Sequence, residues 1–435
     1  MLAGHAVYAK LPHMKFKKTT LKNGLRIITV PLKSNPAVTM LVMVEAGSKY
    51  ETKDISGLSH FLEHMCFKGT KKRPNAIDIS RELDSIGAQY NAFTSQEYTG
   101  YWAKAHPKHL SKIVDVLSDM YLNPVFDSRE IEKEKGVIVE EINMYEDMPQ
   151  RHIHDLFMDL LYGNQPAGWN IAGTRERVKA MTQKHFVDYR SKHYVGKGTV
   201  VIVAGNFNEK KLLKDIEKAF EKISTAKKHT KVKVKETQSS PKVFIKDKKT
   251  DQTHLVLGVR AFDIFNKDGY KLHVLNAVLG GGMSGRLFQK LRDEMGVGYY
   301  VRSGSDEYTD HGYLAVSTGV DKSRVIEVVN AILNEFKRLA TETVPAAEFA
   351  KAKEYLIGRM YLGLEASDDV AEFYGFQEAL KHSNETPDEM AKKIEKVTAA
   401  DVKTIAKKIF QNKSLNLALI GEIKDKSALT KAVRL

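Results

Sequence analysis

Residues 37–47 read AVTMLVMVEAG and residues 253–262 read THLVLGVRAF. These two stretches decide the fold, because both have the pattern of a β-strand and they resemble each other. Each is apolar and rich in β-branched residues. Each follows a shorter strand of similar character, LRIITVP at 25–31 or VFIKDK at 243–248. The chain therefore contains two strand pairs of the same type, far apart in sequence.

The same order of segments continues in both copies. An apolar strand that closes on glycine ends each one, TVVIVAGNF at 199–207 and LNLALIGEI at 415–423, so the second copy follows the first by about 216 residues. The segment 224–241 between them is rich in Lys, Ser and Thr and is typical of a linker. We therefore predict two homologous domains, 14–223 and 242–435.

Helical periodicity fills the middle of each half. The predicted helices cover 55–67, 76–86, 109–121 and 128–145 in the first half, and 269–279, 287–295, 322–339 and 346–361 in the second. Aromatic and β-branched stretches at 89–103 and 298–317 predict further strands. The predicted fold class is α+β, with two homologous domains of the α/β-sandwich type in which helices cover a sheet.

Composition is that of an ordinary globular chain, with 42% hydrophobic and 28% charged residues among 435. The net charge of +14 leaves nucleic-acid binding open as an alternative. However, the lysines are spread along the chain and often alternate with glutamate on predicted helices, which favours solvated helix faces. We expect no nucleic-acid partner, and a steep dependence of binding on salt would be the sign of one.

The only cysteine, Cys66, excludes an internal disulfide, so any metal site must use His and carboxylates. We interpret it as a buried thiol. No apolar run approaches the roughly 20 residues that span a bilayer, and no secretory signal is recognisable. We expect a cytoplasmic protein without membrane insertion, and we interpret residues 1–13, ahead of Met14, as a cloning leader.

The pentapeptide His60-Phe61-Leu62-Glu63-His64 carries the chemistry. On a helix His60 and His64 lie one turn apart on one face, where both imidazoles can reach one zinc ion. Glu63 lies beside them, in a position to take a proton from a water on the metal. The alternative is a pair of surface histidines on an amphipathic helix.

A catalytic zinc needs a third protein ligand. The predicted helix 128–145 offers Glu134, Glu140 and Glu141. Glu134 and Glu141 are two turns apart and share a face, whereas Glu140 points elsewhere. The sequence pattern alone leaves both Glu134 and Glu141 as candidates.

These motifs resemble those of a known family. HFLEH is an inverted zinc-protease motif, H-x-x-E-H, and 76 residues separate His64 from Glu141. This spacing is similar to that of the pitrilysin, insulin-degrading enzyme and mitochondrial processing peptidase family. The resemblance includes GLSHFLEHMCFKGT at 57–70, VIVEEINMYEDMP at 137–149 and LGGGMSGRLFQKLRDEMGVGYYV at 279–301. The chain looks most like the short bacterial members, which are related to the catalytic subunit of the processing peptidase.

The resemblance implies a pitrilysin-like metallohydrolase fold and assigns roles in the first half. His60, His64 and Glu141 become the ligands of one Zn²⁺ per chain. Glu63 becomes the general base, and Glu134 a carboxylate that orients the site from behind the ligands.

Further site residues follow from the same resemblance. The segment Asn91-Ala92-Phe93-Thr94 resembles the edge strand that binds substrate, although aromatic alternation alone would fit a core strand. Arg292 and Tyr299, after the glycine-rich loop, resemble a pair that holds substrate and stabilises the oxyanion. An ordinary surface Arg and core Tyr are the alternative. The three glycines at 280–282 lack the Gly-Lys-Ser/Thr of a phosphate loop.

The second half cannot bind zinc in the same manner, because HVLNA at 273–277 stands in the place of HFLEH.

From the resemblance we predict a zinc endopeptidase for short or unfolded peptides, in which two copies of the chain form a closed chamber. In that homodimer, we expect Arg292 and Tyr299 to serve the zinc of the other copy. The alternative is a non-catalytic structural or assembly subunit of the same lineage, which would typically have lost its ligands.

Overall fold

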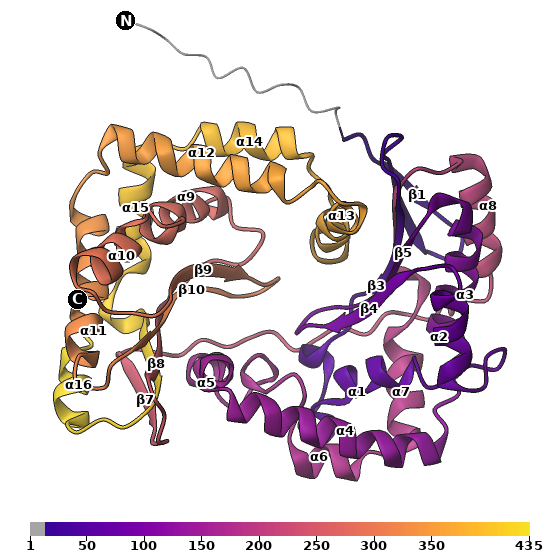
Figure 1. Ribbon diagram of the computed structural model, residues 1–435, viewed down its shortest axis with the longest axis horizontal. Coiled ribbons are helices and arrows are strands. Elements are labelled where there is room, and N and C mark those ends of the chain that lie inside the picture. The colour runs from indigo at the N-terminus through magenta and orange to yellow at the C-terminus, as the bar shows by residue number, and fades with distance from the viewer. Residues whose placement is uncertain (1–13) are drawn as a thin grey trace, which may run out of the picture.

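Each half of the molecule contains one β-sheet, with helices on its outer side and between the two sheets (Figure 1). The computed structural model describes residues 14–435, so the predicted leader at 1–13 lies outside the described residues. The first sheet contains β1 (Lys17–Thr20), β2 (Arg26–Pro31), β3 (Val38–Val44), β4 (Gln89–Thr94), β5 (Thr99–Ala105) and β6 (Thr199–Gly205). Its order is β1-β2-β6-β3-β5-β4, and only β2 and β6 are parallel.

The second sheet repeats this plan. It contains β7 (Lys242–Lys246), β8 (Thr253–Arg260), β9 (Val301–Glu307), β10 (Gly312–Val320) and β11 (Leu415–Ile420). Its order is β7-β11-β8-β10-β9, and only β7 and β11 are parallel. Apart from β1, each strand of the first sheet has a counterpart in the second sheet, at the same place in the strand order and with the same direction. The predicted α+β fold of two similar halves is confirmed.

The helices of the first half are α1 (Leu58–Met65), α2 (Ala76–Asp84), α3 (Leu110–Leu122), α4 (Ser128–Asp147), α5 (Pro149–Tyr162), α6 (Arg175–Ala180), α7 (Gln183–His193) and α8 (Glu209–Ala219). Those of the second half are α9 (Gly269–Gly280), α10 (Arg286–Phe288), α11 (Val325–Thr341), α12 (Ala346–Leu362), α13 (Ser367–Lys381), α14 (Pro387–Glu395), α15 (Ala399–Ile409) and α16 (Lys426–Ala432). No helix of the described residues is long and apolar enough to cross a membrane.

Three predicted segments each contain two elements in the structure. The stretches 89–103 and 298–317 form strands, as predicted, and each turns back on itself to give a hairpin, β4–β5 and β9–β10. The predicted helix 287–295 is a short α10 followed by a π-helical turn, Gln289–Glu294.

Each sheet is covered on one face by a helix from the other half. Helix α13 packs on β2, β3 and β6 of the first sheet, where its residues Val370 and Tyr374 are buried against Leu41 and Ile202. Helix α5 packs on β7, β8 and β11 of the second sheet through Phe157 and its neighbours. Figure 1 shows both helices between the sheets. The predicted domain boundaries at 223 and 242 stay a prediction. However, α5 and α13 each pack on the sheet of the other predicted domain.

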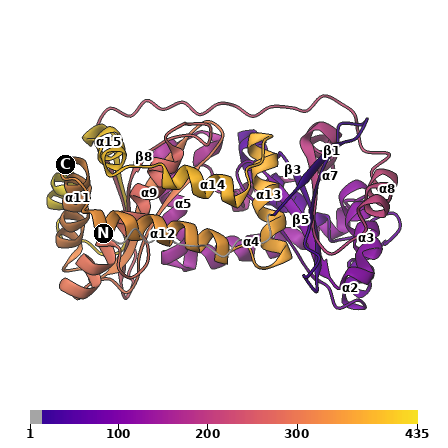
Figure 2. The ribbon, with the colours of Figure 1, turned by 90° about the horizontal axis from the view of Figure 1, so that it is seen from above.

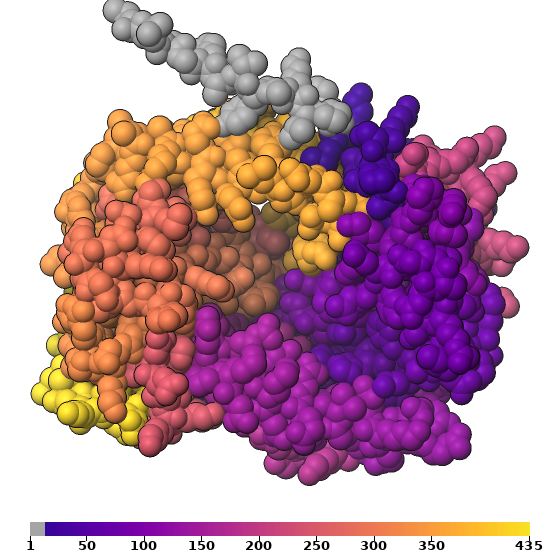
Figure 3. All heavy atoms as spheres, viewed as in Figure 1, coloured from indigo at the N-terminus to yellow at the C-terminus, as the bar shows by residue number. Residues whose placement is uncertain are grey.

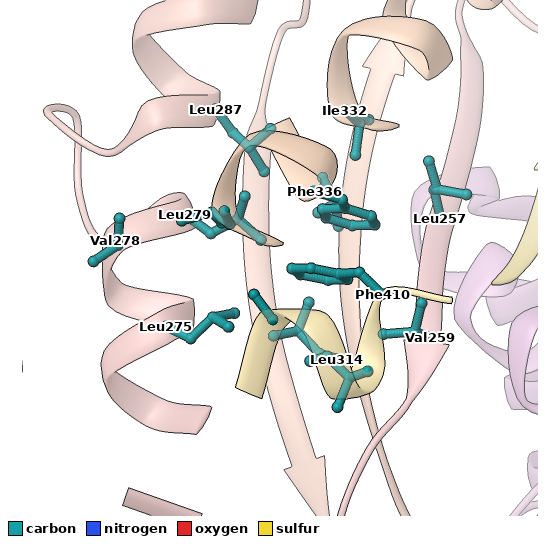
Figure 4. Packing of buried hydrophobic residues seen from close by; sticks show 14 of the residues in the cluster. Leu257, Val259, Leu275, Val278, Leu279, Leu287, Leu314, Ile332, Phe336 and Phe410 are labelled. Carbon is teal, nitrogen blue, oxygen red and sulfur yellow. The ribbon is translucent and has the colours of Figure 1, made fainter. Parts of the chain in front are cut away.

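The remaining face of each sheet carries the larger core. In the second half, Phe336 of α11 and Phe410 stack with their ring centroids 4.2 Å apart (Figure 4). Leucines from α9 and β8 surround them, including Leu275, Leu279 and Leu257.

The segment 224–241 runs along the molecule from one half to the other without regular secondary structure (Figure 2). It is tied at several points. Lys231 forms ion pairs with Glu97 of the first half and with Asp310 of the second, at 3.1 and 3.0 Å. Lys49, which is fully buried, pairs with the same two carboxylates. This cluster joins the β4–β5 turn to the β9–β10 turn.

Candidate metal centre

Gly57 caps the N-terminus of helix α1 and has a left-handed backbone conformation, φ 98°. A side chain there would collide with the carbonyl of Ala172, at 2.5 Å from an ideal Cβ, so glycine is required. The buried carboxylate of Glu51 accepts the backbone N–H groups of Gly57 and Ser59, at 2.8 and 2.6 Å. Burial raises the pKa of Glu51 to about 7. These contacts fix where the helix starts, and therefore which of its residues face α4.

One face of α1 is buried in the core through Leu58, Phe61, Leu62 and Met65. His60 and His64 project from another face, with ring centroids 4.7 Å apart. The i, i+4 spacing thus places both imidazoles side by side, as the sequence pattern predicts.

Helix α4 supplies the carboxylate. Glu141 Oε2 lies 3.5 Å from His60 Nε2 and 3.6 Å from His64 Nε2. One ligand atom from each of the three residues lies within 4.8 Å of the others, and no other such group occurs in residues 14–435. The structure therefore brings together the three predicted ligands, which come from two helices.

Glu134, one of the two candidates on the predicted helix, lies behind His64. Its Oε1 accepts a hydrogen bond from His64 Nδ1 at 2.9 Å, and its Oε2 pairs with Lys68 at 2.5 Å. Burial opposes ionisation of Glu134, but these two contacts outweigh it and lower its pKa. Because an ionised carboxylate only accepts, Nδ1 of His64 carries a proton, and Nε2, which lies on the side of Glu141, is the nitrogen available to a metal ion.

His60 is held neutral. Burial, and then the neighbouring His64, lower the pKa of His60 to about 3. Its Nδ1 is buried without a hydrogen-bond partner among the described residues. Two imidazoles with free Nε2 atoms and one carboxylate are the donor set of a catalytic zinc site, which keeps a fourth position open. The residues present therefore fit the ion.

Glu63 lies next to this group and is linked to the edge strand. Thr94 Oγ1 donates a hydrogen bond of 2.5 Å to Glu63 Oε2. Burial raises the pKa of Glu63, although this hydrogen bond opposes the shift. A cavity of about 350 Å³ is lined by His60, Thr94, Glu141 and Tyr145, and by residues of α5 and of the loop after it. Glu63 is not among the lining residues, but its hydrogen bond to Thr94 connects it to this cavity.

The predicted segment Asn91 to Thr94 forms the second half of β4, the outermost strand of its sheet. Only Thr94 of the four lines the cavity. The ring of Phe93 packs toward Phe376 of α13, at 6.0 Å, and Ala92 is partly buried. Asn91 is exposed. The free edge of β4 is therefore available for main-chain pairing, which does not need these side chains.

Arg292 and Tyr299 are not part of this cavity. Arg292 lies in the π-helical turn, with its guanidinium over the ring of Phe288 at 5.3 Å. Tyr299 is 82% exposed. In the second half, His273 Nε2 donates a hydrogen bond to Glu307 Oε1 at 2.8 Å. Within one chain the structure does not bring Arg292 and Tyr299 to the histidines.

Sequence reasoning missed the part of the cavity that α5 and the loop after it provide. These residues are Arg151, His154, Asp155, Asn170, Ile171 and Ala172. A signal was present, because Pro149 starts a new helix directly after the helix of Glu141. A chain that turns there must bring the first residues of that helix close to the end of α4.

Comparison with known proteins finds relatives over most of the chain. Residues 26–175 match the family described as Insulinase (Peptidase family M16), and residues 180–356 match Peptidase M16 inactive domain. A Bacillus subtilis protein named "Uncharacterized zinc protease YmxG" is 36% identical over 408 residues, 93% of this chain and 98% of its own length. A Streptomyces coelicolor protein, "Uncharacterized zinc protease SCO5738", is 34% identical over 418 residues, 95% of this chain and 91% of its own.

Solved structures show the same fold. A protease from Helicobacter pylori superposes with a TM-score of 0.87 at 23% identity, over 94% of this chain and 100% of that one. A structure titled peptidase M16 inactive domain, from Pseudomonas fluorescens, gives a TM-score of 0.86 at 15% identity, over 94% and 98%.

Removing the charge behind His64 should weaken zinc binding without abolishing it. We expect Glu134→Gln to lower zinc affinity by about 10–100-fold, because the amide orients the imidazole less well and no longer raises its basicity. His64→Ala should abolish stoichiometric zinc. Competition with a chromophoric chelator measures both. Glu140→Gln, an exposed position on the same helix, is the matched control and should bind zinc as the wild type does. Equal losses in Glu134→Gln and Glu140→Gln would contradict this arrangement.

Proposed function

This chain belongs to the M16 family of peptidases, and from that premise we propose that it is a zinc-dependent endopeptidase that hydrolyses short or unfolded peptides. The observation that carries the proposal is the meeting of His60, His64 and Glu141, two of which line a cavity, with Glu63 on the same helix as the histidines. The proposal includes one zinc ion per chain. The absence of a second such group in the described residues supports that number.

Zinc, when bound, supplies Lewis-acid chemistry, which makes a water more acidic and polarises a peptide carbonyl. The chain's own residues do the rest. Glu63 takes the proton of the attacking water and delivers it to the leaving amine. Its raised pKa suits a group that must hold and then release a proton. Thr94 orients its carboxylate, and Glu134 keeps the proton of His64 on Nδ1.

The peptide is held by the free edge of β4. An extended chain that adds to this edge gains main-chain hydrogen bonds that do not depend on its side chains. Folded substrates cannot offer such a strand. Edge pairing that ends at Thr94 would leave a peptide bond close to Glu63.

Arg292 and Tyr299 belong to the proposal through a second copy of the chain. Both are exposed, and Tyr299 is among the most exposed large side chains of the described residues. In a homodimer they would face the zinc site of the other copy, where a guanidinium and a phenol could donate to the developing oxyanion.

Glu63→Gln separates binding from chemistry. The amide has nearly the same shape but cannot take a proton, so turnover should fall by about 10²–10⁴-fold while zinc content and peptide affinity persist. Cleavage of a quenched fluorescent peptide, with and without chelator, measures the loss. Glu132→Gln, an exposed residue of α4, serves as the control. Near-normal turnover in Glu63→Gln would move the base to another residue.

Subunit exchange tests the shared site. A Glu63→Gln chain and an Arg292→Ala/Tyr299→Phe chain should each be inactive alone. In their heterodimer, one site combines both defects, and the other combines an intact zinc site with an intact Arg292 and Tyr299. Activity should therefore reappear on mixing, at one working site per heterodimer.

If the pair served its own chain's zinc, every site in the mixture would carry one defect. A mixture that stays inactive, after subunit exchange has been demonstrated by mass spectrometry, would rule out the shared arrangement.

A further inference from the structure

A second cavity, of about 540 Å³, opens next to the one at the zinc ligands. It lies between the first turns of α5 and the hairpin β9–β10 of the second half, with Tyr300, Arg302, Ser303 and Gly304 on one wall. Arg151 and His154 of α5 line both cavities, so the two spaces meet at this helix. Figure 3 shows the molecule hollowed at its centre, between the two halves.

The walls of this cavity carry two guanidinium groups that lack a carboxylate partner. Neither Arg151 nor Arg302 forms an ion pair with any described residue, whereas half of the arginines of the same residues do. The Arg151 guanidinium lies 5.1 Å from the ring of Tyr145, a contact that holds its plane. Arg302 lies on the exposed side of β9, the outermost strand of the second sheet.

One carboxylate, Asp306, is among the residues that line this cavity, and it accepts a hydrogen bond from the hydroxyl of Tyr313. Asp155 lines the neighbouring cavity and accepts a hydrogen bond from Asn170 Nδ2 at 3.0 Å. Partial removal from water lowers the pKa of His154, which favours its neutral form. Two guanidinium groups against one carboxylate leave the walls of this cavity with a net positive charge, and each guanidinium can bind a carboxylate with two hydrogen bonds.

We propose that the cavity between α5 and β9 is a substrate subsite that selects acidic side chains, with Arg151 reading the position nearer the scissile bond and Arg302 a position farther along. The inference rests on the proposed peptidase function, because a peptide on the edge of β4 that passes Glu141 must continue over α5. A glutamate or aspartate there would meet Arg151 as it leaves the zinc cavity. A lysine would meet two like charges.

The test is a set of peptides that differ in one residue. A neutral, quenched fluorescent peptide carries Glu, Gln or Lys, placed in turn at each of several positions on both sides of the cleaved bond. At one position or more, kcat/KM for the Glu peptide should exceed that for the Gln peptide by about tenfold, as expected for a hydrogen bond between charged groups. The Lys peptide should be the poorest.

Charge reversal makes the test specific. Arg151→Glu should invert the order at the position nearest the bond, so that Lys is preferred over Glu, whereas Arg302→Glu should invert it only farther away. Arg129→Glu carries the same change in charge on α4, at a side chain that is 88% exposed, and should keep the wild-type ratios. Arg151→Lys, a milder change, should retain the preference for Glu but reduce it.

Flat ratios in the wild type, or unchanged ratios in Arg151→Glu, would overturn the subsite and leave the peptidase function standing. If the zinc-loaded wild type cleaves none of the peptides, the proposed function fails. The subsite is then decided by binding alone, through the fluorescence anisotropy of the same Glu, Gln and Lys peptides on Glu63→Gln. Tighter binding of Glu peptides supports it, and equal binding overturns it.

Discussion

Both faces of each sheet are apolar, and this constraint shapes the whole molecule. In β3, Met40 and Val42 face the core of their own half, whereas Leu41 and Met43 face the opposite side. A sheet that is apolar on both faces must be covered on both. Burying one such side chain contributes about 1.5–3 kcal/mol, so neither face can be left in water. The chain meets the requirement by exchange, with α13 on the first sheet and α5 on the second.

The exchange also determines where the chemistry lies. Helix α4 carries Glu141 along the first half, and α5 leaves its end at Pro149 to reach the second sheet. His60, His64 and Glu141, the proposed zinc ligands, therefore lie near the first turns of α5, which form part of both cavities. The buried cluster around Lys49 and Asp310 holds the tips of the two hairpins together, close to the end of β4 where Thr94 meets Glu63.

The sequence indicates much of this because some signals are local. Strict repetition of strand type predicts two similar sheets, and the spacing of His60 and His64 on a helix predicts a shared face. Glu134 and Glu141 were both candidates on spacing alone. Which of the two is the ligand depends on how α1 packs against α4. This packing places Glu134 at Nδ1 of His64 and Glu141 at Nε2.

Other features could not be predicted from local pattern. The alternation in β3 cannot reveal which helix covers its second face, because α13 follows more than 300 residues later. The positions of the turns in the hairpins at 89–105 and 301–320 are not marked in the sequence, because residues 95–98 and 308–311 contain no glycine or proline. The role of Glu51 as a buried cap of α1 depends on a loop conformation that no periodicity describes.

The most direct test of the account is to locate the metal in zinc-loaded crystals by anomalous diffraction on either side of the zinc absorption edge. The account predicts one peak per chain, about 2.0–2.2 Å from the Nε2 atoms of His60 and His64 and from a carboxylate oxygen of Glu141. It also predicts no peak between α9 and β9, where Asn276 and Ala277 replace the acid and the second histidine. A peak in the second half, or a zinc that does not contact Glu141, would contradict it.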